Sequence, residues 1–562
     1  MLKSKEIWRE KKKTILYILC GLLVILIAYL PNFQKGIYTG MDLSFHLNRI
    51  DSLAESLRNG IFPVKLHATR AFGYGYGVGF FYCNFFLYIP AIFINLGMEL
   101  LTAYKLFLFM IYVAIFAAMF FSVIRLTNKP EAAFFSASLY LFSSKIMGAV
   151  YITGALGEIT AYIFTPLAIA GMYLFLVKDE YPYMLMLGFS GLILSHTIST
   201  FLVVIVCAGV LLIYGKSVLK NRSKIVHLMM AVVCVAFITM GFWLPMFEQM
   251  RAQTLKVKHP WTIAVNNMET FSSIANGEYS LGWLITIVFV LNICGMICLL
   301  VVKKGKAIQK VLPFMSIAAI MMFVTTYDFF WHVMNNILEI RLLQFPYRLF
   351  SSVTVLILFS FGMLYHELCL RDELKRVFAL GILCLGIYIS YDTYSGYYLN
   401  NGFEEVENVV NGVYPGLGGG EEWLPVETDL AELIDATKAY DNEGNAYVGE
   451  KINGCNKFIF SADMSKEYYD VPCIWYKGFV AEDSQGKFLE IDKTRETGML
   501  RIYISENRDC EETITVYYKG TLIQKIAYVG NVIGIGILII YLLFCRKEVL
   551  KIKEDSDVRK AV

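Results

Sequence analysis

The sequence predicts an α-helical polytopic membrane protein with about twelve transmembrane helices and a small extracytoplasmic β-sandwich domain before the last helix. Of the 562 residues, 57% are hydrophobic and only 17% are charged, whereas about 25% are charged in a soluble protein. Repeated apolar runs are long enough to cross a bilayer. One acidic stretch, residues 396–522, is instead rich in β-branched and aromatic residues. The net charge of +3 gives no indication of nucleic-acid binding.

Hydropathy places twelve spans along the chain. The first follows a basic N-terminus, "MLKSKEIWREKKK", after which no small-residue cleavage site occurs, so we expect a retained signal-anchor helix. Two short helices that turn at "SHTIST" would fill residues 182–215. The expected spans are 14–30, 100–124, 131–151, 155–177, 182–198, 199–215, 226–246, 280–302, 311–328, 347–368, 377–394 and 523–545.

The positive charges of the short loops set the expected orientation. Residues 80–98 are apolar enough to cross the membrane. If they lie in the outer interface without crossing, every later basic loop joins the basic N-terminus in the cytoplasm; if they cross, those loops lie outside. We therefore expect a multi-pass protein of the cell membrane with both termini in the cytoplasm and large outer segments at 31–98, 247–282 and 396–522.

Three parts follow from this topology. Residues 1–395 form the transmembrane domain, whose first outer loop (31–98) carries interfacial helices. Residues 396–522 form the outer β-rich domain, which holds about 24 acidic and about 11 basic residues and begins with a flexible join, "GLGGGEEW". Residues 523–562 form the last helix and a basic cytoplasmic tail. A disulfide among the outer cysteines is open, because no pairing can be read from their spacing; they are Cys83, Cys455, Cys473 and Cys510.

Ionisable side chains gather at one level, the outer boundary of the membrane, whereas the span centres are nearly free of them. Such groups next to lipid are candidates for function. Five separate stretches place polar groups at this level, and we take these groups as candidates for catalysis or substrate binding. They are Asp42, His46 and Arg49, then His67 and Arg70, then Glu158, then His196, and finally Arg341, Gln344 and Arg348.

The motif "DLSFHLNR" sets Asp42, His46 and Arg49 four and three residues apart, so the three side chains share one face of a helix. The other face is apolar, and such a helix would lie in the membrane interface. Asp42 could cap this helix above a solvated polar face, or it could be a reactive carboxylate that takes a proton from an attacking hydroxyl. It could also bind a divalent cation, Mg or Mn, with His46, although two ligands do not define a metal site.

Arginines bind phosphate oxygens bidentately and stay charged near apolar surroundings. Arg341 and Arg348, on either side of "QFPYR" and its Gln344, would suit a lipid phosphate, and anchoring beside phospholipids is the alternative for each. The run "GYGYGVG", residues 73–79, could approach a sugar through its glycines and stack on it through its tyrosines, or be a flexible loop.

Two further candidates have equally local alternatives. His196 in "LSHTIST" is either a satisfied polar group at a helix turn or a substrate contact. Glu158 in "GALGE" could pair with Lys145 or Arg49 for structural reasons, or bind a sugar hydroxyl or a metal.

Several phrases, in their order, resemble a bacterial membrane-protein family. "DLSFHLNRIDSLAESLRNGIFPVKL", "GALGEITAYIFTPLAI", "LSHTISTF" and "QFPYRLF" are similar to the 6-pyruvoyl-tetrahydropterin synthase-related membrane proteins, which are close to the YfhO-like proteins, within the GT-C superfamily of membrane glycosyltransferases. The resemblance implies that a sugar moves, with inversion, from a polyprenyl-phosphate donor to an extracytoplasmic glycan, lipid or protein. By position, Asp42 would be the base.

Two other functions would fit a membrane protein of this kind. A transporter or flippase for lipid-linked sugars would place its site near the bilayer midplane, on broken helices in repeated halves, but this chain has its polar groups at the outer edge and no visible repeat. A non-catalytic protein of envelope assembly would keep its function when Asp42 is replaced.

Overall fold

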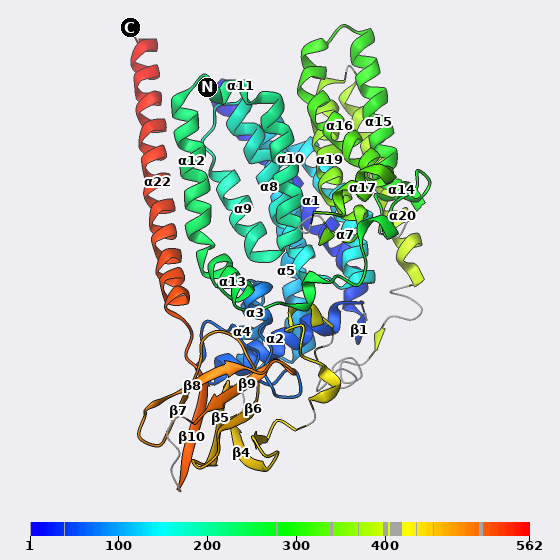
Figure 1. Cartoon of the computed structure of the whole chain (residues 1–562). Coiled ribbons are helices and arrows are strands. Elements are labelled where there is room, and N and C mark those ends of the chain that lie inside the picture. The colour runs from blue at the N-terminus through cyan, green and yellow to red at the C-terminus, as the bar shows by residue number, and fades with distance from the viewer. Residues whose placement is uncertain are drawn as a thin grey trace.

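The computed structural model describes residues 2–38, 40–276, 279–337, 341–368, 370–396, 403–404, 417, 419–433, 435–452, 455–504 and 510–561. A long helical bundle occupies the upper part of Figure 1, and a β-barrel lies below it. Short helices of the first loop fill the space between them. Both chain ends lie at the end of the bundle that is far from the barrel (Figure 1).

Helices cover all twelve expected spans, but the expected span 226–246 is broken at Thr239 into two helices. Among the described residues, ten helices or helix pairs are long and apolar enough to cross a membrane, and a further pair, α12 and α13, is bent by 69°. The remaining helix, α9, is apolar but has only 13 residues, so it is shorter than the other spans. The helices are α1 (Leu2–Tyr29), α5 (Leu100–Thr127), α6 (Pro130–Leu141) with α7 (Ser144–Gly148) and a π-helical turn, η2 (Ala149–Thr153), α8 (Leu156–Val177), α9 (Tyr183–Ser195), α10 (Thr197–Tyr214), α12 (Arg222–Ile238), α13 (Met240–Ala252), α15 (Gly282–Val301), α16 (Gly305–Thr326), α19 (Phe350–Glu367) after η5 (Pro346–Leu349), α20 (Asp372–Ser395) and α22 (Leu522–Ala561).

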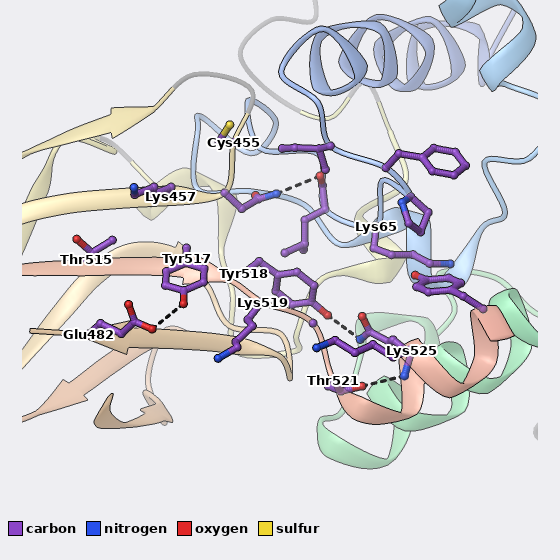
Figure 2. A pocket seen from close by; sticks show the side chains of 18 of the residues that line it. Lys65, Cys455, Lys457, Glu482, Thr515, Tyr517, Tyr518, Lys519, Thr521 and Lys525 are labelled. Atoms are coloured by element: carbon purple, nitrogen blue, oxygen red, sulfur yellow. Dashed lines mark hydrogen bonds between the residues drawn. The ribbon is translucent and has the colours of Figure 1, made fainter. Parts of the chain in front are cut away.

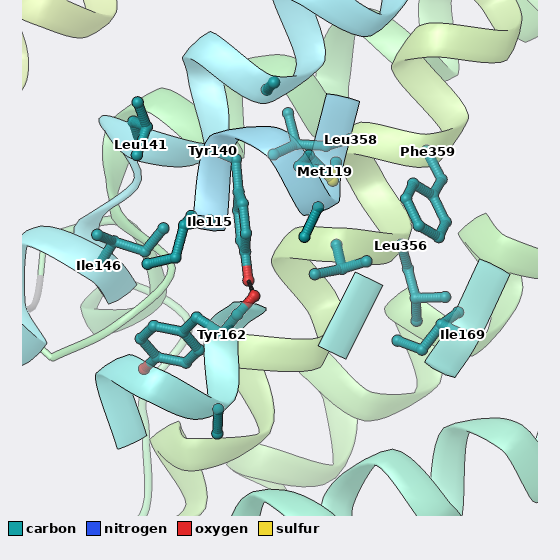
Figure 3. Packing of buried hydrophobic residues seen from close by; sticks show 14 of the residues in the cluster. Ile115, Met119, Tyr140, Leu141, Ile146, Tyr162, Ile169, Leu356, Leu358 and Phe359 are labelled. Atoms are coloured by element: carbon teal, nitrogen blue, oxygen red, sulfur yellow. Dashed lines mark hydrogen bonds between the residues drawn. The ribbon is translucent and has the colours of Figure 1, made fainter. Parts of the chain in front are cut away.

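The centre of the bundle consists of helices that are apolar all round. The spans of α6, α8 and α19 are almost entirely buried, whereas those of α1, α15 and α22 keep most of their apolar side chains on the outside. Figure 3 shows this core, where the Tyr140 hydroxyl donates to the carbonyl oxygen of Tyr162 at 3.1 Å among aliphatic side chains. An exposed apolar belt around a buried centre is what a lipid solvent requires. The polytopic membrane fold is therefore confirmed.

The domain before the last helix is β-rich, as expected, but its eight strands close into one antiparallel barrel in the order β10-β5-β4-β3-β6-β9-β8-β7. A sandwich and a barrel share the same alternation of buried and exposed residues, so the sequence alone does not separate them. Closure comes from β10, which pairs with both β5 and β7. The strands are β3 (Lys438–Asp441), β4 (Ala446–Ile452), β5 (Lys457–Asp463), β6 (Tyr468–Ile474), β7 (Phe479–Glu482), β8 (Phe488–Lys493), β9 (Met499–Tyr503) and β10 (Glu511–Tyr518).

The first loop joins the bundle to the barrel. Its main helix, α2 (Leu43–Arg58), sends Leu47 and Ile50 into the core of the bundle and Phe45 into a second apolar cluster that the first loop shares with the barrel domain. Next come α3 (Val78–Phe81) and α4 (Tyr88–Asn95), which at four and eight residues are far too short to cross a bilayer. Loop residues 37–38 form β1, which pairs with β2 (Phe403–Glu404). Because α2 is covered on both sides, it does not lie open on lipid as its amphipathic pattern led us to expect.

Candidate active site

The first turn of α2 is fixed against the start of α8 by a close backbone contact. The Asp42 N–H donates to the carbonyl oxygen of Thr153 at 2.7 Å. A Cβ on Gly40 would lie 2.6 Å from the backbone nitrogen of Gly154, and Gly154 itself has a φ of +62°. Glycine is therefore required at both positions. This contact holds Asp42 beside the α8 N-terminus, which carries Glu158.

The Asp42 carboxylate is the most distinctive group at this level. Asp42 occupies the N-cap position of α2, but its side chain makes no capping hydrogen bond. The residue is open to solvent, yet enough protein surrounds the carboxylate that burial raises its pKa to about 6, and the charge of Glu422 raises it further while Arg348 lowers it. A carboxylate of this kind is largely ionised at neutral pH and titrates close to it.

Charged and polar groups from three other elements, and Tyr82 from the same loop, lie near Asp42. Burial raises the pKa of the Tyr82 hydroxyl, on which the charges of Asp42, Glu158 and Arg348 all act. The Tyr82 ring also lies 5.9 Å from that of His196. The structure thus brings together Asp42, Glu158, His196 and Arg348, from the first loop, α8, the α9–α10 turn and η5 respectively; we call these four residues the Asp42 cluster.

Hydrogen bonds hold three of these groups in place. Glu158 accepts from the hydroxyl of Tyr162 at 2.6 Å. His196 caps α10, since its Nδ1 accepts from the backbone N–H of Ser199 at 3.3 Å. The Arg348 guanidinium donates to the carbonyl oxygen of Leu343 at 2.8 Å. The imidazole of His196 therefore has a structural role through Nδ1, and its other ring nitrogen is not used by the cap.

His46 and Arg49 share a face of α2 with Asp42, as their spacing predicts, but both side chains are buried. The Arg49 guanidinium donates to the carbonyl oxygens of Tyr82 and Cys83 and to Oδ1 of Asn84 at 2.8–3.1 Å. His46 Nδ1 lies 3.4 Å from the same guanidinium. Burial, with the charge of Arg49 second, holds the pKa of His46 well below its usual range, so the ring is neutral.

His67 and Arg70 contact the far part of α2 and the loop. His67 is fully buried, with Nε2 3.2 Å from the side-chain nitrogen of Asn84. Arg70 donates to the carbonyl oxygen of Asn48 and forms an ion pair with Asp51 at 2.8 Å. In the structure these two residues organise the loop beneath the Asp42 cluster.

Arg341 and Gln344 lie in the segment that leads into η5. Gln344 has a φ of +59°, and its carbonyl oxygen accepts from the side chain of Asn267 at 3.2 Å. The Nε of Arg341 is buried and has no hydrogen-bond partner in the described part of the chain. Of this segment's candidates, Arg348 is the one whose charge acts on Asp42.

Two residues absent from the candidate set also belong here. Lys145 is buried, donates to the carbonyl oxygen of Tyr279 at 3.1 Å and lies 4.8 Å from the centre of the Tyr347 ring. Glu422 comes from the join before the barrel, and its Oε2 is buried with no hydrogen-bond partner among the described residues. In the sequence Lys145 lies close to the turn between the expected spans 131–151 and 155–177, near Glu158, and this position could have indicated that it belongs to the site. Nothing local marks Glu422.

The join that carries Glu422 is docked, although its composition suggests flexibility. Trp423 stacks on Phe81 with ring centres 5.5 Å apart and planes 9° apart. The Tyr76 hydroxyl donates to the carbonyl oxygen of Gly420, and that of Tyr476 donates to the carbonyl oxygen of Trp423. Contacts with both the first loop and the barrel therefore hold Glu422 near Asp42.

The described residues contain no group of three or more His, Cys, Asp or Glu side chains placed to hold a metal ion. The eleven cysteines in the described part of the chain are free thiols, including Cys83, Cys455, Cys473 and Cys510. The chemistry of the cluster is thus that of a carboxylate opposite cationic side chains: it could accept a proton and hold an anionic group.

A family model described as "6-pyruvoyl-tetrahydropterin synthase related domain; membrane protein" matches residues 80–398. No curated protein matches the chain. Among solved structures, the cryo-EM structure of arabinofuranosyltransferase AftD from Mycobacteria is similar over 70% of this chain and 27% of that chain, with 12% sequence identity and a TM-score of 0.44. This chain therefore spans about a quarter of that protein's length. The family match includes Glu158, His196 and Arg348 and begins after Asp42.

Proposed function

Because the chain belongs to the family of 6-pyruvoyl-tetrahydropterin synthase-related membrane proteins, we propose, from the geometry of its membrane-boundary site, that it is a membrane glycosyltransferase of GT-C type. The donor would be a polyprenyl-phosphate sugar, and the acceptor an extracytoplasmic glycan, lipid or protein. One observation carries the proposal: the Asp42 carboxylate, fixed beside the start of α8 by the hydrogen bond from the Asp42 N–H to Thr153, stands within electrostatic reach of the Arg348 guanidinium from a different element.

In this mechanism Asp42 takes the proton of an acceptor hydroxyl while the hydroxyl oxygen bonds to the anomeric carbon. The bond from that carbon to the phosphate oxygen breaks on the opposite face, so the configuration inverts, and the polyprenyl phosphate leaves with the electron pair. Arg348 and Lys145 would stabilise the negative charge that grows on the phosphate. Both side chains are held in place before the reaction, by Leu343 and Tyr279 respectively.

The other candidates would bind the substrate or fix the site. Glu158 and the ring nitrogen of His196 that the cap does not use would hold sugar hydroxyls, and Arg341 would contact the lipid phosphate. The buried pair His46 and Arg49 would set the orientation of the helix that carries Asp42.

We place the barrel end of the molecule outside the cell membrane and both termini in the cytoplasm. Support comes from the basic short loops and from the position of both chain ends opposite the barrel (Figure 1). Labelling of intact cells with a membrane-impermeant maleimide tests this, because Cys510 is exposed on the barrel. Failure to label Cys510 in intact cells, with labelling in opened cells, would reverse the orientation.

The test of catalysis replaces Asp42 with asparagine in the purified full-length protein reconstituted in liposomes. A panel of undecaprenyl-phosphate hexoses and pentoses serves as donors, and release of undecaprenyl phosphate is measured. We expect Asp42→Asn to lower turnover at least about 100-fold, the usual contribution of a general base. The control is Asp328→Asn, a carboxylate exposed on α17 (Asp328–Met334) beside His332.

Stability separates loss of chemistry from loss of fold. Folding raises the pKa of Asp42 from 3.8 to about 6, so the neutral form is favoured more strongly in the folded protein than in the unfolded chain. Ionisation above about pH 6 therefore costs folding free energy, which the asparagine avoids. At pH 7.5 we expect Asp42→Asn to be at least as heat-stable as the wild type. Normal turnover in this variant would end the catalytic proposal, and donor movement across the bilayer without turnover would favour a flippase.

A further inference from the structure

A cavity lies where the barrel, the first loop and the start of α22 meet (Figure 2). Its volume is about 840 Å³, and none of its lining residues belongs to the Asp42 cluster. Strands β5, β7 and β10 supply one wall, residues 61–66 of the first loop a second, and the first two turns of α22 a third. The cavity is therefore a separate site at the membrane end of the barrel.

The cavity is lined by lysines although the domain that supplies most of its lining is acidic. Residues 396–522 carry 24 acidic and 11 basic side chains, yet Lys457, Lys519 and Lys525 all line the cavity (Figure 2). None of these three makes an ion pair with any residue that the structure describes. Lys519 instead lies 4.4 Å from the centre of the Phe488 ring. Three ammonium groups without a carboxylate partner leave a local positive potential.

The two carboxylates that line the cavity are already used by the barrel. Glu482 accepts from the hydroxyl of Tyr517 at 2.7 Å, as Figure 2 shows. Asp483 accepts from the backbone N–H groups of Gln485 and Lys487, both at 2.9 Å. These bonds stabilise the strand ends. With Lys65, the cavity lining holds four lysines against these two carboxylates, so its net formal charge is positive.

The rim of the cavity on the bundle side is apolar. Phe62, which lines the cavity, is 72% exposed, and Leu522, which follows the lining residue Thr521 in the chain, is 73% exposed. The last candidate span begins at Leu522, so the hydrocarbon boundary passes close to this rim. A ligand that fills the cavity and covers the rim has an anionic head and an apolar body. A purely water-soluble anion would leave the rim exposed.

We propose that this cavity binds the phosphate headgroup of an anionic lipid in the leaflet that the barrel faces. Lys457, Lys519 and Lys525 would hold the phosphate oxygens, while Phe62 and Leu522 would contact the acyl chains. The bound lipid would tie the barrel to the membrane surface from the side away from Asp42. This site does not depend on whether the chain transfers a sugar.

Binding is measured by native mass spectrometry of the full-length protein in a mild detergent, titrated with dioleoyl phosphatidylglycerol and, separately, with neutral dioleoyl phosphatidylcholine. A lysine near an anionic lipid surface strengthens binding by roughly fivefold. The double variant Lys519→Gln/Lys525→Gln should therefore bind phosphatidylglycerol roughly 25-fold more weakly. The matched control is Lys35→Gln/Lys258→Gln, which removes two charges from the same side of the bundle and should change affinity less than twofold.

Thiol protection shows where the lipid binds. Cys455 lines the cavity, whereas Cys510 is exposed on the same barrel and away from the cavity. Phosphatidylglycerol should slow maleimide modification of Cys455 and leave that of Cys510 unchanged, as read by peptide mass spectrometry. The proposal would be overturned if phosphatidylglycerol protected Cys455 in the Lys519→Gln/Lys525→Gln variant at the same lipid concentration that protects it in the wild type.

Two further outcomes would also overturn it. One is an equal loss of affinity in the control pair, which would mean general surface attraction. The other is competition by glycerol 3-phosphate at the concentrations at which phosphatidylglycerol binds, which would mean a site for a soluble phosphate. Phe62→Ala distinguishes the sources independently, because it should weaken binding of the lipid severalfold and leave binding of glycerol 3-phosphate unchanged.

Discussion

Glu422 gives the sharpest test of the site, because it reaches Asp42 only through the docked join. Its carboxylate is the largest contribution after burial to the raised pKa of Asp42. Glu422→Gln removes that charge and keeps the size and polarity of the side chain. Asp42 is then easier to ionise, so its pKa falls and more of it is in the base form at acid pH.

The size of the effect follows from the pKa of Asp42, which is about 6. With this value, about 90% of Asp42 is ionised at pH 7 and about 10% at pH 5, so a reaction that needs the ionised base slows about tenfold between them. Turnover should be lost as the pH falls through about 6 in the wild type. This loss forms the acidic limb of the pH–rate profile. In Glu422→Gln the limb should move to lower pH, and in Arg348→Gln it should move to higher pH.

The assay is kcat/KM for release of polyprenyl phosphate between pH 4.5 and 8 in reconstituted protein. Glu421→Gln is the matched control, since Glu421 is the adjacent carboxylate, exposed and paired with Lys256 at 3.2 Å. Its limb should coincide with that of the wild type. A limb that stays in place in Glu422→Gln, or a wild-type limb near pH 4, would refute the coupling of Asp42 and Glu422.

Two other predictions concern the elements that support the site. Gly40→Ala should lower the free energy of unfolding by about 1–3 kcal/mol, because its Cβ would press on the backbone of Gly154. Thermal unfolding should show no comparable loss in the control Gly381→Ala, where a Cβ meets nothing within 4 Å. Equal stability of the two variants would contradict the close-packing argument. Arg501→Lys should destabilise the barrel by about 1 kcal/mol or less, since lysine cannot reproduce the two hydrogen bonds of 2.6 and 2.8 Å from Arg501 to Asp470. An unchanged midpoint of thermal unfolding would show that this pair contributes nothing.

The sequence by itself determined the membrane architecture. A bilayer demands a fixed length of apolar chain for each crossing, so the spans can be read from composition. Helices cover all the expected spans, although 226–246 is bent by 69° at Thr239 and α9 is shorter than a full span. The brevity of α3 and α4 agrees with the expectation that residues 80–98 do not cross. Spacing alone also put Asp42, His46 and Arg49 on one helical face, because the period of a helix is fixed by its backbone.

Tertiary structure decided what those residues meet. The pattern of α2 suggested a helix lying on lipid, but α4, α5 and the first loop cover it, and His46 and Arg49 are buried, with Arg49 bonded to residues 82–84. The closure of the barrel and the placement of Glu422 beside Asp42 depend on segments far apart in the chain. A local period fixes where a side chain points on its own element, whereas its partner is fixed by how separate elements pack, and no short stretch of sequence records that.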